Sequence, residues 1–235
     1  MKQNRPSIMF PKKAVNFLSL IKNVMKKILI LFLLASGIAE VYAQKAKQVS
    51  VAAAAPAKEN GEAFLNDYFM QTYAGLERSV SGLTSEQLNF KPSADKWSIN
   101  ECLEHIVLTE KMLFEEAKKT MEAPASPKRR KDVKVRDEEI IKGISDRSHK
   151  FKAPAELTGK GKYGDAAQAL AELEQSRKSV SSYLSTHPVA DLRNHISDTP
   201  FGLNDGYHAF LYIAGHTARH TGQIEEIKAS PNFPK

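Results

Sequence analysis

Residues 215–223 read Gly-His-Thr-Ala-Arg-His-Thr-Gly-Gln and place His216 and His220 four positions apart. On an α-helix, residues four apart lie one above the other with Cβ atoms about 5 to 6 Å apart, so both imidazoles can face one metal ion. A divalent ion held by a protein needs at least three ligands. His105, on an earlier predicted helix, is our candidate for the third. The alternative is a chance pair of histidines on a surface helix.

The helix that carries this stretch is predicted to follow a turn at residues 199–204, with Asn204 as its N-cap, and to stop before Pro231. Gly215 and Gly222 each cost a helix up to about 1 kcal/mol relative to alanine. We therefore expect the backbone of another segment to approach this helix closely. Its side chains four positions apart form one row: His208, Tyr212, His216, His220 and Ile224.

The helix that would supply His105 has a clear start signal. In the sequence Trp-Ser-Ile-Asn-Glu-Cys at residues 97–102, Ser98 and Glu101 have the spacing of a capping box. The helix is therefore predicted to begin at Ile99, and it fades near residue 121. Its apolar row places His105 on the flank of a buried stripe. Cys102 is either a small core residue or a fourth candidate ligand.

Two more helices complete the predicted fold. Apolar residues recur every three or four positions over 61–82, and a second such helix begins after Asp165 as N-cap. A shorter capping box, Thr84 with Gln87, marks a helical turn between the first two long helices. The connection over residues 124–164 holds prolines, glycines and a short helical piece at 137–148. Its length suits a crossover between parallel helices, so we predict an all-α four-helix bundle over residues 61–230.

The amino terminus has the pattern of a secretory signal. Lys26 and Lys27 precede an apolar run, and the small residues before Gln44 suggest cleavage after Ala43. We therefore assign residues 1–43 to a signal, with Met25 as an alternative start, and residues 44–60 to a flexible tether. The apolar run is too short to span a membrane comfortably, and an uncleaved anchor is the alternative. We expect an exported protein, periplasmic or extracellular, without a stable membrane span once the signal is removed.

Charge and cysteine content narrow the class of protein further. Residues 1–43 hold seven of the 34 lysines and arginines but one of the 27 acidic residues, so the remaining chain is close to neutral. This balance argues against a nucleic-acid partner, and the basic run at residues 128–131 is read as a solvated loop. Because Cys102 is the only cysteine, no intrachain disulfide can form.

Three motifs occur together and in order: Leu-Thr-Ser-Glu-Gln-Leu at 83–88, Lys-Trp-Ser-Ile-Asn-Glu-Cys-Leu-Glu-His-Ile at 96–106, and His-Thr-Ala-Arg-His-Thr-Gly-Gln-Ile at 216–224. Together they resemble the DinB superfamily of metal-binding four-helix bundles, which is unrelated to the DNA polymerase of that name. The resemblance covers about residues 62–228. It implies that His105, His216 and His220 bind a divalent ion and that the protein forms a homodimer. The secretion signal and the long basic loop depart from the family pattern and argue against transfer of intracellular thiols.

Three histidines leave a coordination position open, which suits a metal-dependent hydrolase or group transferase acting on a small molecule. The sequence chooses neither the substrate nor the ion among Zn, Ni, Fe and Mn. Arg177 interrupts an apolar row and is either half of a structural ion pair or an anion clamp. Glu104 and Glu110 are candidates for a general base or for supporting the ligands, although a solvated face is the simpler expectation for both.

Other polar residues have weaker assignments. Tyr212 and His208 are predicted to line the cleft on the metal side, whereas His187 and His195 are expected to be exposed in a connecting loop. Two alternatives to an enzyme remain open. One is a non-catalytic metal-binding bundle of the cell envelope. The other is a structural bundle with three incidental histidines.

Overall fold

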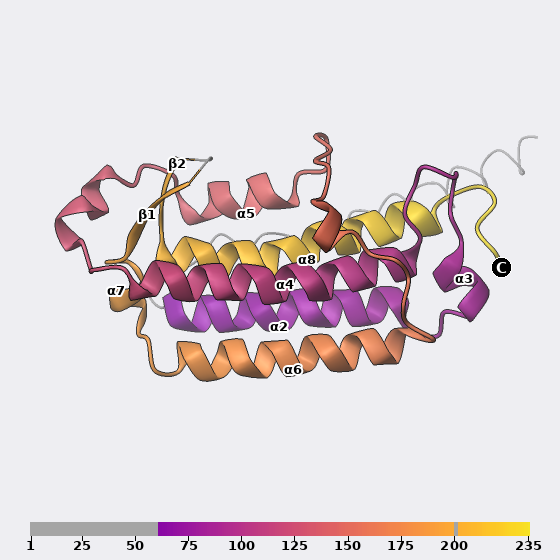
Figure 1. Ribbon diagram of the computed structural model, residues 1–235, viewed down its shortest axis with the longest axis horizontal. Coiled ribbons are helices and arrows are strands. Elements are labelled where there is room, and N and C mark those ends of the chain that lie inside the picture. The colour runs from indigo at the N-terminus through magenta and orange to yellow at the C-terminus, as the bar shows by residue number, and fades with distance from the viewer. Residues whose placement is uncertain (1–60, 200–201) are drawn as a thin grey trace, which may run out of the picture. The chain divides into compact units, whose positions relative to one another are not determined.

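The computed structural model describes residues 61–199 and 202–235, so the predicted signal and tether lie outside the described residues. Four long helices pack side by side (Figure 1), which confirms the predicted all-α four-helix bundle. They are α2 (Gly61–Val80), α4 (Ile99–Glu122), α6 (Ala166–Leu184) and α8 (Gly206–Lys228). None of the helices within the described residues is both long and apolar enough to cross a bilayer.

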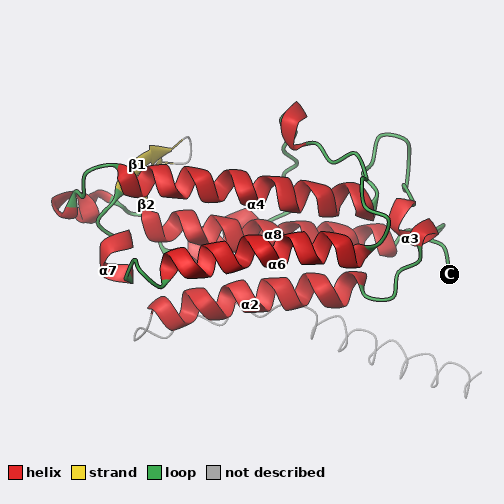
Figure 2. Ribbon diagram, turned by 60° about the horizontal axis from the view of Figure 1, so that its bottom comes forward, coloured by secondary structure: helices red, strands yellow, loops and turns green. Residues whose placement is uncertain are grey.

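The helices run in two parallel pairs. Helices α2 and α8 are parallel, because Tyr207 Oη donates to Gly61 O near the start of both and Lys228 Nζ donates to Ser79 O near the end of both. Helices α4 and α6 are parallel to each other and antiparallel to α2 and α8. Both views show the axes of α4 and α6 aligned (Figures 1 and 2). The topology is therefore up, down, down, up.

Two parallel consecutive helices require a connection that returns along the bundle, as predicted. Residues 123–165 make this crossover and contain η1 (Pro127–Asp132), α5 (Asp137–Ser145) and η2 (Ala155–Leu157). Helix α5 packs against α8. A Cβ atom at Gly215 would overlap the side chain of Ile144. The absence of a side chain at Gly215 therefore allows α5 to pack against α8. The approaching group is a side chain and not the backbone that the sequence led us to expect.

The predicted helix starts are largely correct. Thr84 and Gln87 form the capping box of α3 (Ser85–Asn89), Ser98 and Glu101 form that of α4, and Asp165 caps α6. Helix α8, however, is capped by Asp205, whose carboxylate accepts from the backbone N–H of His208 at 2.9 Å. The prediction of Asn204 as N-cap was wrong by one residue.

Asn204 is not a cap because it lies in a small hairpin, which was not predicted from the sequence. Strands β1 (Ile196–Thr199) and β2 (Gly202–Asp205) pair antiparallel, with Ser197 opposite Asn204. The Asn204 side-chain amide donates to Thr199 Oγ1 at 2.8 Å. A short helix, α7 (Val189–Leu192), precedes the hairpin.

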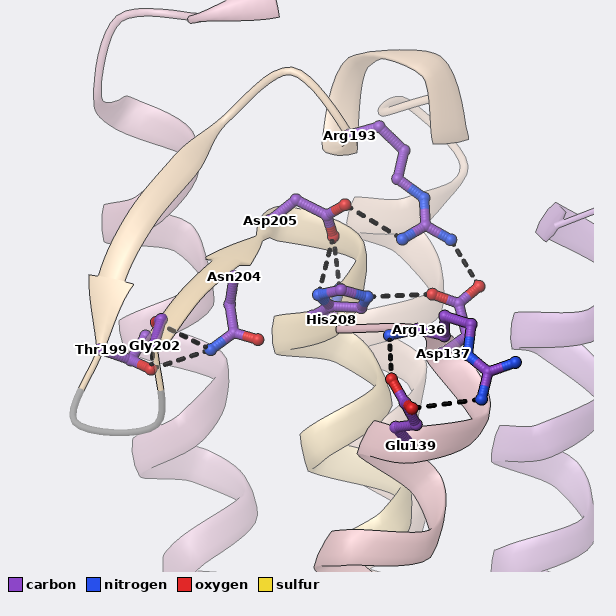
Figure 3. A network of polar contacts seen from close by, with 9 residues as sticks. All are labelled: Arg136, Asp137, Glu139, Arg193, Thr199, Gly202, Asn204, Asp205 and His208. Atoms are coloured by element: carbon purple, nitrogen blue, oxygen red, sulfur yellow. Dashed lines mark hydrogen bonds and ion pairs between the residues drawn. The ribbon is translucent and has the colours of Figure 1, made fainter. Parts of the chain in front are cut away.

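A network of charged side chains joins the beginnings of α5 and α8 to the end of α7 (Figure 3). Arg193 bridges Asp137 at 2.6 Å and Asp205 at 3.0 Å, and His208 Nε2 lies 3.0 Å from Asp137. Although burial opposes ionisation of Asp137, hydrogen bonds from His208 and Arg193 lower its pKa to about 2. The network thus fixes the crossover to this end of the bundle with an ionised carboxylate.

Candidate metal centre

The structure brings the three predicted histidines together between the antiparallel helices α4 and α8. The ring centroid of His105 lies 4.9 Å from that of His216 and 4.5 Å from that of His220, and the two α8 rings are 4.4 Å apart. One ring nitrogen from each histidine lies within 4.8 Å of the other two. The rings therefore face one common point.

Hydrogen bonds fix which nitrogen two of these rings present. His105 Nδ1 lies 2.7 Å from Leu157 O. A carbonyl oxygen can only accept, so Nδ1 carries the hydrogen and the Nε2 lone pair remains free. His220 Nδ1 lies 2.9 Å from Gln223 Oε1, which also accepts from Arg147 at 3.2 Å. Because Arg147 can only donate, this Gln223 atom is the amide oxygen, and His220 also presents Nε2.

Burial keeps the three imidazoles in the neutral form that binds metals. Burial lowers the pKa of His105. It also lowers the pKa of His216 to about 3, helped by the neighbouring His105 and Arg219. The pKa of His220 falls well below its usual value because of burial and the adjacent rings. Three neutral imidazoles, two of them with a fixed tautomer, fit a divalent cation of the Zn, Ni, Fe or Mn type.

These shifts predict acid sensitivity of the metal-free protein. A histidine whose pKa is lowered by folding takes up its proton more readily in the unfolded chain, so acid favours unfolding. We expect the free energy of unfolding, measured by urea titration without metal, to fall as the pH drops below about 6.5. Replacing His216 by asparagine should make this dependence less steep. An equal pH dependence in the His216→Asn variant would contradict the assignment.

The indole of Trp97 forms one wall of the site. Its ring centroid lies 4.8 Å from that of His105, edge to face, and 6.2 Å from that of His220, stacked. Trp97 also packs on the core cluster that contains Cys102. Cys102 is fully buried, and desolvation raises its thiol pKa to about 12. It is a core residue, and the three-histidine group does not include it.

Arg177 forms the ion pair that was one of its two predicted roles. Its Nε donates to both carboxylate oxygens of Glu110, at 2.8 and 2.9 Å. The remaining nitrogens donate to Phe69 O and to the hydroxyls of Thr72 and Thr217. The guanidinium borders a cavity of about 480 Å³ between α2 and α6, but these protein acceptors occupy both of its terminal nitrogens. None of the three histidines lines this cavity.

Glu104 and Glu110 are both buried, so the expectation of a solvated face was wrong. The Glu110 carboxylate belongs to the pair with Arg177. Glu104 accepts from the backbone N–H groups of Lys160, at 2.6 Å, and Lys162, at 3.3 Å. Helix periodicity could not predict the burial of Glu104, because the backbone groups that cover it come from the crossover.

The expectations for four further polar residues need correction. His208 lies on the same row as His216, but it is buried in the Asp137 network near the start of α8 (Figure 3), about 12 Å along the helix from His216. Tyr212 packs against the core cluster at that end, with Asn204 beside its hydroxyl. His195 is buried rather than exposed, and its Nδ1 bonds to Ala123 O. His187 is half-buried and stacks on Tyr183.

The groups that orient the ligands were not predicted from the sequence. Gln223 stands three positions after His220, a spacing that places both on one helix face and could have been recognised. Arg147 and the Leu157 carbonyl come from the crossover, and no local pattern links them to the histidines.

Comparisons with known sequences show the family to which this chain is related. A sequence model described as the DinB superfamily matches residues 68–224. The uncharacterized protein YuaE from Bacillus subtilis (strain 168) is 29% identical over 153 residues, which are 63% of this chain and 88% of YuaE.

A solved structure shares the fold. YfiT from Bacillus subtilis superposes with a TM-score of 0.52 at 15% identity, covering 77% of this chain and 93% of YfiT. YfiT is described as "a probable metal-dependent hydrolase with an unusual four-helix bundle topology".

Proposed function

The chain belongs to the DinB superfamily, and from that premise we propose that it is a metal-dependent hydrolase whose ion is held by His105, His216 and His220. The observation that supports this most strongly is the convergence of three neutral imidazoles, two of them with Nδ1 already donating. A divalent ion held by these three residues would supply Lewis acidity for a hydrolytic reaction. The proposal includes export, which rests on residues 26–43 alone.

The protein groups around the ion have separate tasks. Leu157 O and Gln223 hold two ligand rings in one orientation. The Trp97 indole covers one side of the rings and limits the access of water there. Glu104 and Glu110 are engaged with the crossover and with Arg177, so neither is free to act as a general base.

These occupied carboxylates favour one competing function, a non-catalytic metal-binding bundle. In that case the ion would cross-link α4 and α8 and stabilise the fold without turnover. The two functions differ in what a substrate panel would show, although both require the same ion.

The test is to purify the full chain without added metal, measure its metal content by elemental analysis, and assay ester, amide and phosphomonoester hydrolysis. We expect about one divalent ion per chain and hydrolysis that a chelator removes and the ion restores. Stoichiometric ion without turnover would favour the non-catalytic bundle. A fully stable protein that binds no divalent ion would contradict both functions.

A further inference from the structure

Residues 146–164, here called the strap, connect α5 to α6 and contact both helices that carry the histidines. Figure 1 shows this part of the chain crossing over α4 and α8 before it turns to α6. The strap contains η2 and little other regular structure. Its path is therefore set by its contacts with the two helices.

On α8 the strap is held by two arginines. Arg147, in the strap, donates to both carboxylate oxygens of Glu226, at 2.6 and 2.7 Å, and to Gln223 Oε1 at 3.2 Å. Arg219, next to His220 in sequence, donates to the carbonyls of Asp146 and His149. Because Gln223 Oε1 also accepts from His220, one amide oxygen joins the strap to a metal ligand.

On α4 the strap is held by backbone groups. Leu157 O accepts from His105 Nδ1, and the N–H groups of Lys160 and Lys162 donate to Glu104. Between Leu157 and Lys160 the backbone of the strap lies so close to α4 that a Cβ atom at Gly159 would overlap the Glu101 carbonyl. The strap thus also contacts the ring of His105, the metal ligand on α4.

We propose that the strap is part of the metal centre: Arg147, acting through Gln223, and the Leu157 carbonyl position His220 and His105, so metal binding and strap docking are coupled. This inference rests on the proposed function, because it concerns the same ion. An imidazole without a partner for Nδ1 is free to change tautomer and to rotate, and contacts of this kind change metal affinity about 10- to 100-fold. Coupling is reciprocal, so the ion must stabilise the docked strap by the same factor.

The alternative is that Arg147 makes an ordinary surface ion pair. Its side chain is 19% exposed and that of Glu226 is 58% exposed, and pairs of this kind contribute little to stability. A surface pair would leave metal affinity unchanged when it is removed. The metal dissociation constant therefore separates the two roles.

The experiment measures Zn²⁺ affinity of the full chain by competition with a chromophoric chelator. We expect Gln223→Leu and Arg147→Met each to weaken binding about 10- to 100-fold. Gln223→Glu should bind at least as tightly as the unmodified protein, because a carboxylate is a stronger acceptor for His220 Nδ1. The matched control is Arg136→Met, which removes an arginine that is paired with Glu139 at the start of α5 and does not contact His105, His216 or His220. It should leave the affinity unchanged.

Hydrogen exchange gives a second readout of the coupling. Backbone amides of residues 147–162 should be more protected with Zn²⁺ than without it, and Arg147→Met should reduce this difference. Circular dichroism shows whether each variant is folded. If Arg147→Met does not fold, Arg147→Lys replaces it and should weaken binding too, because lysine lacks the planar fork that contacts two partners.

The outcomes distinguish this inference from the proposed function. An unmodified protein that binds no Zn²⁺ or other divalent ion overturns both. An unmodified protein that binds the ion, with folded variants of equal affinity and strap protection that does not depend on metal, overturns the coupling alone. Loss of affinity in both Arg147→Met and Gln223→Leu, with Gln223→Glu unimpaired and metal-dependent protection of the strap, supports it.

Discussion

Replacing His220 by alanine is expected to remove the divalent ion from the protein. Each ligand of a zinc site with an apparent binding free energy of about 10–16 kcal/mol contributes roughly 3 kcal/mol, so losing one weakens binding about 100-fold or more. His220 is also the ligand joined to the strap through Gln223. Elemental analysis of the purified variant and its Zn²⁺ dissociation constant give the measurement, and turnover should disappear with the ion.

A matched control is His187→Ala, which removes a histidine just after the carboxyl end of α6 whose ring stacks on Tyr183. This variant should keep its ion. A thermal shift offers a second comparison, since a ligand at about 100 times its dissociation constant stabilises the folded state by about 2.7 kcal/mol. Stoichiometric metal in His220→Ala would remove the case for this centre.

Replacing Arg177 by methionine is expected to cause the largest loss of stability, about 3–5 kcal/mol, because it leaves a buried carboxylate without its partner. The Glu110 side chain is 1% exposed. Burial raises the Glu110 pKa even though Arg177 opposes this shift, so the pKa should rise further in the variant. Urea unfolding followed by circular dichroism measures the loss.

The pH dependence of this loss has a definite sign. A carboxyl group whose folded-state pKa is raised takes up its proton in the folded protein first, so the variant regains stability as the pH falls. The difference in unfolding free energy between the variant and the unmodified protein should therefore shrink as the pH falls from neutral toward the ordinary pKa of a glutamate. The double variant Arg177→Met/Glu110→Leu buries no charge here and should recover most of the loss. A double variant as unstable as the single one would contradict this account.

The sequence was sufficient for the bundle because the decisive signals are local. Ser98 and Glu101 mark the start of α4 within four residues, and the i, i+4 spacing fixes the relation of His216 to His220. Helix spacing alone could not place His105 opposite these two residues. The resemblance of three ordered motifs to a known family predicted this placement, and the distances between the rings agree with it.

The features that were not predicted from the sequence depend on contacts between segments that are distant along the chain. The burial of Glu104 is caused by backbone groups about 56 residues away, and the strap that supplies them has no periodic pattern. The hairpin was missed because four-residue strands are too short for alternation to identify them. His208 was misplaced because a shared helix row does not show which end of the bundle a residue faces. Its neighbours Asp137 and Arg193 come from other elements.

The position of Trp97 has a practical consequence. It is the chain's single tryptophan, and it lies against two of the three imidazoles that face the centre. When excitation selects tryptophan over the seven tyrosines, the emission of the protein therefore comes from this location. Paramagnetic ions such as Ni²⁺ or Cu²⁺ quench a nearby indole, so the protein carries an intrinsic optical reporter of occupancy that needs no attached dye.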